Sequence, residues 1–328
     1  MSVENTAVVL FNEIPIGAAP DEADTKVQAD LVAAALEKLG FKTEQMAFSL
    51  DFKPFIDNLS LLAPVFVFNL TEAVDGEGKL SHFAPFLLEH LKIKYSGCPA
   101  EAIYLTTNKI LTKKILRLSE VNTPSWVSSN EAEAFNPGSS YIIKPVNEDA
   151  SIGLENDCLI RAETVSELRD IITKKQKMTG KEFFAEEYID GREFNVSVLG
   201  RDGCPEILPP AEIKFIDYQE TGRVKIVDYK AKWDEDSFEY QNTQRTFEFD
   251  KDDLPLLDEL KTITRICWNC FHLKGYARID FRVDQTGKPW MLEVNANPCL
   301  TPGSGLMAAA ERIGLTFTDV IEKIIKEI

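Results

Sequence analysis

The chain has 328 residues, of which 44% are hydrophobic, and its formal net charge is −17. A chain of this length and composition can bury a sizeable core and is expected to form two or three domains. The acidic excess argues against nucleic acid or an anionic membrane surface as a partner. A small phosphate-bearing molecule is not excluded, because a few placed cations would suffice to bind it.

Targeting and redox features point to a cytoplasmic protein. No apolar run reaches the length of a transmembrane helix, and the first residues, MSVEN, lead into a short strand without a signal-peptide pattern. The six cysteines are too scattered for a disulfide framework. Cys267 and Cys270 form a CxxC pair within a helical pattern, so we expect two core or partly buried thiols. The three histidines are dispersed and show no zinc spacing.

The N-terminal segment alternates apolar strands with helices. Residues 6–12 (TAVVLFN) and 63–70 (APVFVFNL) predict buried strands, residues 24–39 predict a helix, and a second helical stretch ends at Leu91. This alternation predicts an α/β domain with a parallel sheet over residues 1–105.

A second domain is expected over residues 106–190. It begins with a helix over residues 106–120, for which Thr107 or Asn108 is the expected cap. SYIIKP and FFAEEYI predict strands, separated by a helix near residues 165–177.

A third domain is expected over residues 191–328. Its expected elements are strands at 193–199 and 212–215, an acidic stretch at 234–248, a helix at 260–273, a hairpin, and a terminal helix at 317–328. The hairpin comes from YARIDFRVDQTGKPWMLEVNA, in which two alternating segments flank a turn at 285–289. We expect Val283 to pair with Trp290 across this turn.

That pairing would set Asp280 opposite Glu293, and Arg278 opposite Asn295. Two carboxylates that face each other repel, so the arrangement stabilises nothing without a cation. Removing one carboxylate is therefore expected to raise the melting temperature of the metal-free protein slightly. Asp, Glu and an Asn carbonyl are hard oxygen ligands that suit Mg²⁺, which often bridges to substrate phosphates. The alternative is a solvated hairpin face with ordinary charges.

A magnesium site implies a phosphate cradle elsewhere in the chain. Neither a P-loop nor a GxGxxG after a strand is present. Lys144 ends the apolar strand YIIK, and the VNEDASIG that follows contains Ser151 and Gly153, whose amides could approach phosphate. Taken alone, Lys144 is better explained as an edge or solvated residue.

The stretch AEEYIDGREF provides a second candidate for nucleotide contact. Asp190 and Gly191 form its turn, and Glu186, Tyr188 and Glu193 flank that turn. A backbone segment at a domain junction can hydrogen-bond an adenine edge, and a nearby glutamate can hold the ribose hydroxyls. A solvated hairpin explains the same residues.

The order of these motifs resembles the ATP-grasp superfamily, and most closely the D-alanine–D-alanine ligases. A strand ending in Lys, a small-residue loop, EEYIDGREF and ARIDF…LEVNANP…TPGSG follow one another. The resemblance also covers VFNLTEAVDGEGKLSHFAPFLLEHLKIKYSG, TTNKILTKKIL and GLTFTDVIEKII, and so spans nearly the whole chain. It implies an α/β (α+β) ATP-grasp fold, with an N-terminal parallel-sheet domain, a small lid domain and a C-terminal domain that carries the metal site.

The resemblance also implies a role for individual residues. The residues implied to contact ATP are Lys109 and Lys144 at the phosphates, Ser151 and Gly153 in a flap over them, Glu186, the backbone of Ile189 and Leu292 at adenine, and Glu193 at the ribose. The implied ligands of two Mg²⁺ ions, or of Mn²⁺, are Asp280, Glu293 and Asn295. The implied catalytic residues are Lys232 at the γ-phosphate, Arg278 at the oxyanion and Ser304 at the carboxylate of the second amino acid.

The implied reaction joins two amino acids through an acylphosphate and releases ADP and phosphate. It implies small-molecule amino-acid substrates, a place in the peptidoglycan biosynthesis of the cell wall, and a possible homodimer. Ligation of other amino acids or hydroxy acids on the same scaffold is an alternative. So is a non-catalytic nucleotide-binding protein, although a protein that only binds nucleotide does not need Arg278.

The sequence departs from the family in the part that holds the first amino acid. The family glutamate that binds its amine lies in a motif that FNEIPIGAAPDEAD replaces, and Glu13, Asp21 or Glu22 could take its place.

Three further positions differ from the family pattern. Ala150 and Trp233 stand where the family carries hydroxyls, and Cys299 stands where it has an oxyanion-hole glycine. We expect the changes at Ala150 and Trp233 to alter the first amino-acid pocket, so that two D-alanines are not the best pair and another amino acid is preferred in the first position.

Overall fold

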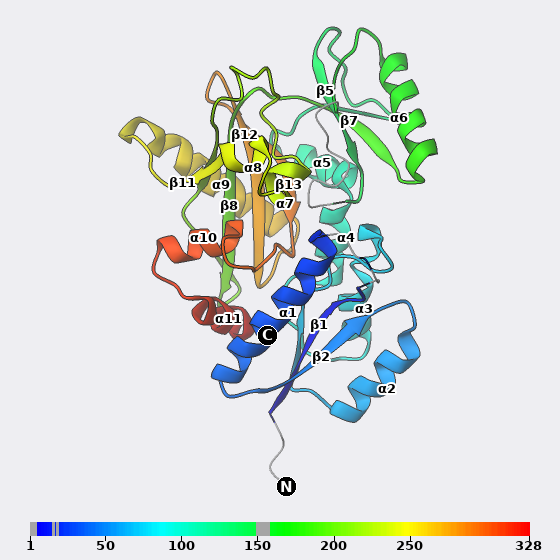
Figure 1. The fold of residues 1–328 in the computed structure, drawn as a ribbon, viewed down its shortest axis with the longest axis vertical. Coiled ribbons are helices and arrows are strands. Elements are labelled where there is room, and N and C mark those ends of the chain that lie inside the picture. Colours follow the sequence, from blue (N-terminus) through cyan, green and yellow to red (C-terminus); the bar gives the residue numbers. More distant parts are fainter. Residues whose placement is uncertain (1–4, 15–16, 18–19, 149–157) are drawn as a thin grey trace.

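The computed structural model describes residues 5–14, 17, 20–148 and 158–328, without the side chains of 20–22. Its strands form three sheets, which draw in turn on residues 6–69, 126–187 and 191–295 (Figure 1). None of the helices formed by the described residues is both long and apolar enough to cross a membrane.

The first sheet is parallel. Its strands are β1 (Thr6–Asn12) in the centre, β2 (Lys42–Phe48) and β3 (Phe66–Asn69). Parallel neighbours need a crossover, and the helices α1 (Pro20–Lys38) and α2 (Phe52–Leu62) provide it. The expected parallel α/β arrangement is confirmed, and β2 is the strand that the sequence pattern did not reveal.

A pair of short helices replaces the single helix expected over residues 106–120. They are α4 (Ala100–Thr107) and α5 (Lys109–Leu118), and α3 (Phe83–His90) precedes them. Asn108 has an extended backbone between the two, and its side chain accepts a hydrogen bond from the amide of Leu111. Asn108 is therefore the N-cap of α5, and it places Lys109 in the first turn.

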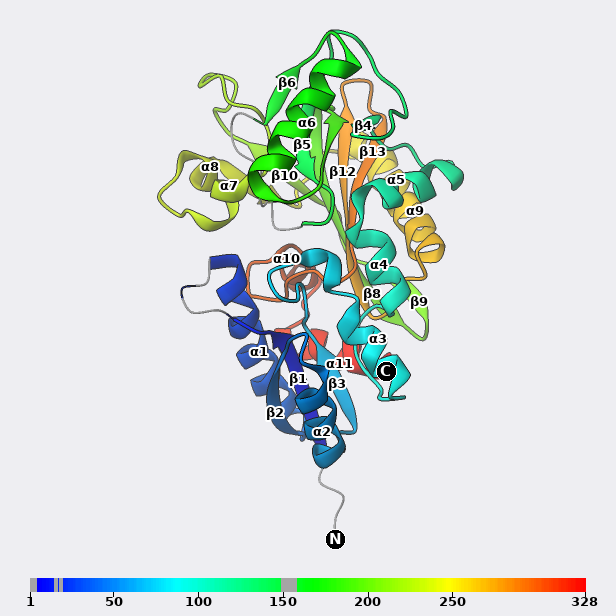
Figure 2. The same cartoon turned by 90° about the vertical axis from the view of Figure 1, so that its right-hand side faces the viewer.

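The second sheet is antiparallel, with strand order β4-β7-β5-β6. Its strands are β4 (Trp126–Ser128), β5 (Ser140–Pro145), β6 (Leu159–Arg161) and β7 (Phe183–Glu187). The helix α6 (Val165–Thr179) covers one face with apolar side chains (Figure 2). Lys144 near the end of β5 and Glu186 near the end of β7 line the cavity.

The third sheet has strand order β11-β10-β8-β12-β13, with β9 paired to β8. Its strands are β8 (Gly191–Arg201), β9 (Cys204–Ile207), β10 (Ala211–Phe215), β11 (Thr243–Thr246), β12 (Tyr276–Asp284) and β13 (Pro289–Asn295). The helix α9 (Leu254–Cys270) buries one face of the sheet. Cys267 is buried in that core and Cys270 is partly buried, as expected for two thiols that are not a redox pair.

A close approach of two backbones explains Gly191, the turn residue of AEEYIDGREF. A Cβ atom at this position would lie 1.9 Å from the carbonyl oxygen of Val283 on β12. Only glycine leaves room for β8 to begin beside β12, and this pairing aligns Asn195 with Asp280 further along.

The hairpin register agrees with the expectation at the polar end and differs at the turn. Asp280 lies opposite Glu293, and Arg278 lies opposite Asn295. The expected pairing of Val283 with Trp290 is wrong, because Val283 lies opposite Pro289.

A β-bulge reconciles the two ends of the hairpin. The register shifts between Asp280 and Phe281, which leaves Leu292 as the extra residue of β13. The alternation therefore reverses: Met291 is buried in the core, whereas Leu292 and Glu293 both line the same cavity. The bulge brings an apolar contact surface and a carboxylate side by side.

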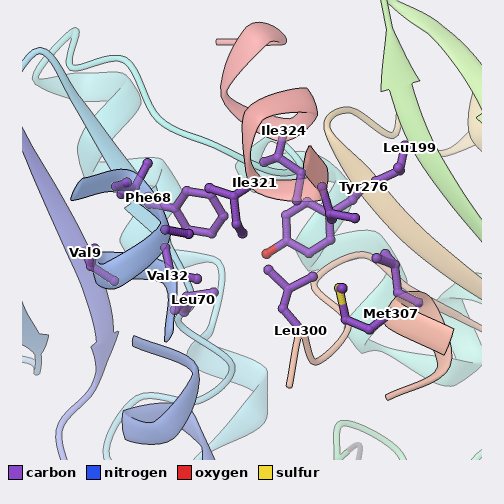
Figure 3. Close-up of a cluster of buried hydrophobic side chains, with 14 of the residues drawn as sticks. Val9, Val32, Phe68, Leu70, Leu199, Tyr276, Leu300, Met307, Ile321 and Ile324 are labelled. Carbon is purple, nitrogen blue, oxygen red and sulfur yellow. The ribbon is translucent and has the colours of Figure 1, made fainter. Parts of the chain in front are cut away.

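An apolar core joins the first sheet to the last two helices, α10 (Gly305–Arg312) and α11 (Phe317–Lys326). Figure 3 shows Phe68 near Ile321, with side chains of both segments in one cluster. Tyr276 at the start of β12 is buried in the same cluster, and its hydroxyl donates to the side-chain oxygen of Asn297 at 2.6 Å. This core fixes the N-terminal sheet against the third sheet.

Candidate active site

A single large cavity of about 1090 Å³ collects most of the candidate residues. Its walls include β1 and α1, the ends of β5 and β7, and the polar face of the third sheet. All three sheets thus contribute to one space that can hold a nucleotide together with smaller molecules.

Asp280 is the most constrained carboxylate on the hairpin face. Arg278 donates to its two oxygens at 2.8 Å each, and the amide of Asn195 donates at 2.7 Å. Asp280 and its bidentate arginine are both nearly buried. The arginine and the carboxylate hold each other in place at the centre of the cavity wall.

Glu293 faces several cations. Lys109 Nζ lies 3.7 Å from its carboxylate and also donates to the carbonyl of Glu148 at 2.5 Å. Burial raises the pKa of Glu293, but the positive charges of Lys109, Lys144, Lys232 and Arg278 more than offset this and lower it to about 2. Glu293 is therefore charged at neutral pH.

The donor set at this point suits Mg²⁺. Among the described residues no group of three or more His, Cys, Asp or Glu could hold a metal by itself. Asp280 and Glu293 face each other, and Asn295 lines the same wall, with its side-chain oxygen accepting from the amide of Asn297 at 3.0 Å. Two carboxylates and one amide oxygen leave positions for water and phosphate, as Mg²⁺ prefers.

Glu186 on β7 lies between two lysines. Lys144 on β5 and Lys113 on α5 each place Nζ 2.5 Å from one of its oxygens. Lys113 is fully buried and also donates to Thr123 and to the carbonyl of Pro124. Burial raises the pKa of Glu186, but the two lysines more than compensate and hold it below its ordinary value.

Lys113 was not found by sequence reasoning, although TTNKILTKKIL contains it. Helical spacing puts it one turn after Lys109 on the same face, which is the signal that could have revealed it. Lys144 is not the solvated edge residue of the alternative interpretation, since its side chain is only 13% exposed.

Glu193 on β8 pairs with Arg282 on β12 at 3.0 Å. Burial raises the pKa of Glu193, while Arg282 works in the opposite direction. Arg282 also donates to the carbonyls of Gly191 and Lys225. Arg282 was not among the site residues predicted from the sequence, although it lies on the same face of β12 as Arg278 and Asp280.

The remaining described candidates also line the cavity. They are Ile189, Lys232, Leu292 and Ser304. Lys232 lies on α7 (Tyr229–Trp233), and Ser304 caps α10 by accepting from the amide of Met307. Ser151 and Gly153 lie outside the described residues, as does Ala150.

The end of the cavity at α1 carries acidic residues other than those expected. Asp24 and Glu72 line it, and the amide of Gln28 donates to both, at 3.2 and 3.1 Å. The thiol of Cys299 also donates to Asp24, at 3.2 Å. Burial raises the pKa of Asp24, and these two hydrogen bonds oppose it.

The acidic residues expected to bind the amine of the first amino acid were Glu13, Asp21 or Glu22. Glu13 is exposed and does not line the cavity, and the side chains of Asp21 and Glu22 lie outside the described residues. Trp233 does line the cavity, and within the described part of the chain its indole nitrogen is buried without a hydrogen-bond partner.

Comparison with known proteins defines the class. The crystal structure of a Bacillus anthracis D-alanine–D-alanine ligase complexed with ATP superposes with a TM-score of 0.74 at 20% identity, covering 98% of this chain and 96% of that one. The chain therefore has the ATP-grasp fold.

Sequence relatives give the family. A family profile described as "D-ala D-ala ligase C-terminus" matches residues 114–326. D-alanine–D-alanine ligases of Aquifex aeolicus and Marinomonas sp. are 31% and 33% identical to this chain. Each alignment covers 73% of this chain, and 75% and 70% of the respective relative. The chain belongs to the D-alanine–D-alanine ligase family. The expected fold and the expected enzyme class, an ATP-dependent ligase, are confirmed.

Proposed function

We propose that this enzyme joins the carboxyl group of one amino acid to the amino group of a second at the expense of ATP. The observation that carries the proposal is the hairpin face. Asp280 and Glu293 face each other beside Arg278, and lysines from three other elements surround the same cavity. Charge of both signs is concentrated there, as phosphoryl transfer requires.

The nucleotide is assigned to the space between the second and third sheets. Lys109 and Lys144 hold the phosphates, and Ser151 and Gly153 are proposed to close over them. The carboxylate of Glu186 and the backbone of Ile189 meet the adenine edge, and the bulged Leu292 supplies an apolar surface for the base.

The ribose and the metal complete the nucleotide site. Glu193, already oriented by Arg282, accepts from the ribose hydroxyls. Asp280, Glu293 and Asn295 would hold two divalent ions, Mg²⁺ or Mn²⁺. Such ions neutralise charge on the phosphate oxygens.

The reaction has two steps. An oxygen of the first amino acid's carboxylate attacks the γ-phosphorus, the bond to the β-phosphate oxygen breaks, and ADP leaves with an acylphosphate formed. The amine of the second amino acid then attacks the acyl carbon, phosphate leaves, and the nitrogen loses a proton to give the amide.

The protein supplies position and charge for both steps. Lys232 stabilises the γ-phosphoryl group, Arg278 stabilises the tetrahedral oxyanion, and Ser304 holds the carboxylate of the second amino acid. Asp24 and Glu72 are proposed to hold the amine of the first amino acid, since both carboxylates line the cavity.

Amino-acid-dependent release of ADP and phosphate tests the proposal, with mass spectrometry to identify the dipeptide. Paired D- and L-amino acids should be screened with Mg²⁺-ATP. ADP release that no amino acid stimulates would refute the proposed ligase. A cytoplasmic location and a homodimer are also part of the proposal. Light scattering coupled to size-exclusion chromatography tests the dimer.

A further inference from the structure

Three arginines line the cavity, and their partners differ. Arg278 is paired with Asp280 at 2.8 Å and Arg282 with Glu193 at 3.0 Å. Within the described part of the chain, Arg245 on β11 has no carboxylate within 4 Å. It donates to the carbonyl of Gly303 at 2.8 Å. Among the three cavity arginines, Arg245 is the one that forms no ion pair with a carboxylate of the described residues.

Arg245 is held close to the residues that handle the second amino acid. A methyl group at Gly305 would lie 3.2 Å from Cδ and 3.6 Å from Nη1 of Arg278, and 3.9 Å from Nη2 of Arg245. The two guanidinium groups thus flank the first residue of α10, next to Ser304. The hydrogen bond to Gly303 fixes Arg245 in this loop.

The electrostatics of Arg245 agree with an anion-binding role. The side chain of Arg245 is exposed, but it lines the cavity, where the surrounding protein removes part of its hydration; this loss, and then repulsion from Arg278, lower the pKa of Arg245, and Asp280 opposes this only in part. A metal ion held by Asp280 would offset the charge of that carboxylate, so the two arginines would then face the cavity with less compensation. A bound anion would relieve this repulsion.

Under the proposed function, a neutral acceptor leaves Arg245 unused. The α-carboxylate of the second amino acid is assigned to Ser304, and Arg278 is assigned to the oxyanion. We infer that the second amino acid carries an additional carboxylate in its side chain, as aspartate and glutamate do, and that Arg245 pairs with it. This inference rests on the proposed function and narrows the substrate class of the same site.

Matched acceptors test the inference. The specificity constant of the wild-type enzyme should be measured by dipeptide formation for aspartate against asparagine and for glutamate against glutamine, in both chiralities. Within each pair the size is conserved and the charge differs. We expect the acidic member of at least one pair to be preferred by about tenfold or more, the value of one charge-assisted hydrogen bond.

Variants locate the effect. Arg245→Gln should remove the preference for the acid while the amide acceptor reacts as before, and Arg245→Lys should restore part of it. Arg201→Gln is the matched control, because Arg201 is 69% exposed and does not line the cavity.

The possible outcomes are distinct. If Arg245→Gln slows acidic and amide acceptors equally, Arg245 binds the α-carboxylate of any acceptor and the inference is wrong. If the wild type forms dipeptides but prefers neutral acceptors, the inference fails while the proposed ligase stands. If no amino acid stimulates ADP release, the proposed function fails first.

Discussion

The ammonium group of Lys113 lies 2.5 Å from the carboxylate of Glu186, and neither side chain is more than 3% exposed. The second oxygen of Glu186 is 2.5 Å from Lys144, whose side chain is on the cavity wall. Two lysines therefore share one carboxylate. If Lys144 turns to a phosphate, as proposed, Lys113 still neutralises Glu186, so that no buried carboxylate is left unpaired.

Lys113→Met should destabilise the protein by about 3 kcal/mol, because removing one partner of a buried ion pair leaves the other poorly compensated. It should also raise the KM for ATP, since Glu186 then holds Lys144 more tightly. Urea unfolding and steady-state kinetics measure the two effects.

The double variant Lys113→Met/Glu186→Gln is the control for this pair. With both charges removed, at least half of the lost stability should return. A double variant that is less stable than Lys113→Met alone would contradict the pairing. Lys114→Met, at an exposed salt bridge to Glu131, should change stability by less than about 1 kcal/mol.

Glu293→Gln should leave a folded protein whose turnover is lower by at least about a hundredfold, because a ligand at the site of charge development is lost. ADP release at several Mg²⁺ concentrations measures this effect. Turnover close to that of the wild type at ordinary Mg²⁺ would refute the assignment of Glu293 as a metal ligand.

The stability of the metal-free Glu293→Gln variant should depend on pH in a defined way. The folded-state pKa of Glu293, about 2, is below its ordinary value, so its charge contributes stability above about pH 4.5. This contribution is lost as the pH falls through 2. Without metal, the variant should melt below the wild type at pH 6, and the difference should shrink between pH 4.5 and 2. The sequence alone predicted the opposite sign, because it did not show Lys109 beside Glu293.

Lys144→Ala should raise the KM for ATP by roughly tenfold, the value of a charge-assisted hydrogen bond of about 1.5 kcal/mol. Its effect on stability should stay below about 1 kcal/mol, since Lys113 continues to neutralise Glu186. Equilibrium binding of ATP provides a second measurement. An unchanged affinity for ATP with unchanged turnover would leave Lys144 with a structural role alone, as a partner of Glu186.

Asp24→Asn should raise the KM for the first amino acid by about tenfold or more and leave the KM for ATP unchanged, because one charged hydrogen bond to the amine is lost. Glu13→Gln is the matched control, since Glu13 is exposed and lies outside the cavity. A larger effect of Glu13→Gln than of Asp24→Asn would reverse the proposed assignment.

The part of the site that could be predicted from the sequence is the polar face of the β12–β13 hairpin. Antiparallel pairing turns positions along a chain into neighbours, so Asp280 and Glu293 could be placed opposite each other before the structure was known. The turn is one residue shorter than expected, and the bulge at Leu292 restores the register beyond it. A bulge of this kind depends on packing, here the burial of Met291, which local sequence does not reveal.

The residues that were missed depend on contacts between segments far apart in the chain. Lys113 meets Glu186 across 73 positions, and Asp24 meets Cys299 across 275. No periodicity relates such positions. Asp24 enters the cavity only because α1 packs against the last helices, and that packing follows from the complete fold.

The apolar core shared by the first sheet and α11 has a consequence for synthesis on the ribosome. Ile321 and Ile324 pack in the same cluster as Val9 and Val32, although they are translated long after these two valines. The N-terminal sheet therefore cannot complete its core until α11 has been synthesised and has left the ribosome, and before that point part of its apolar surface stays uncovered. Nascent chains that stop before α11 should accordingly remain sensitive to protease throughout their N-terminal segment.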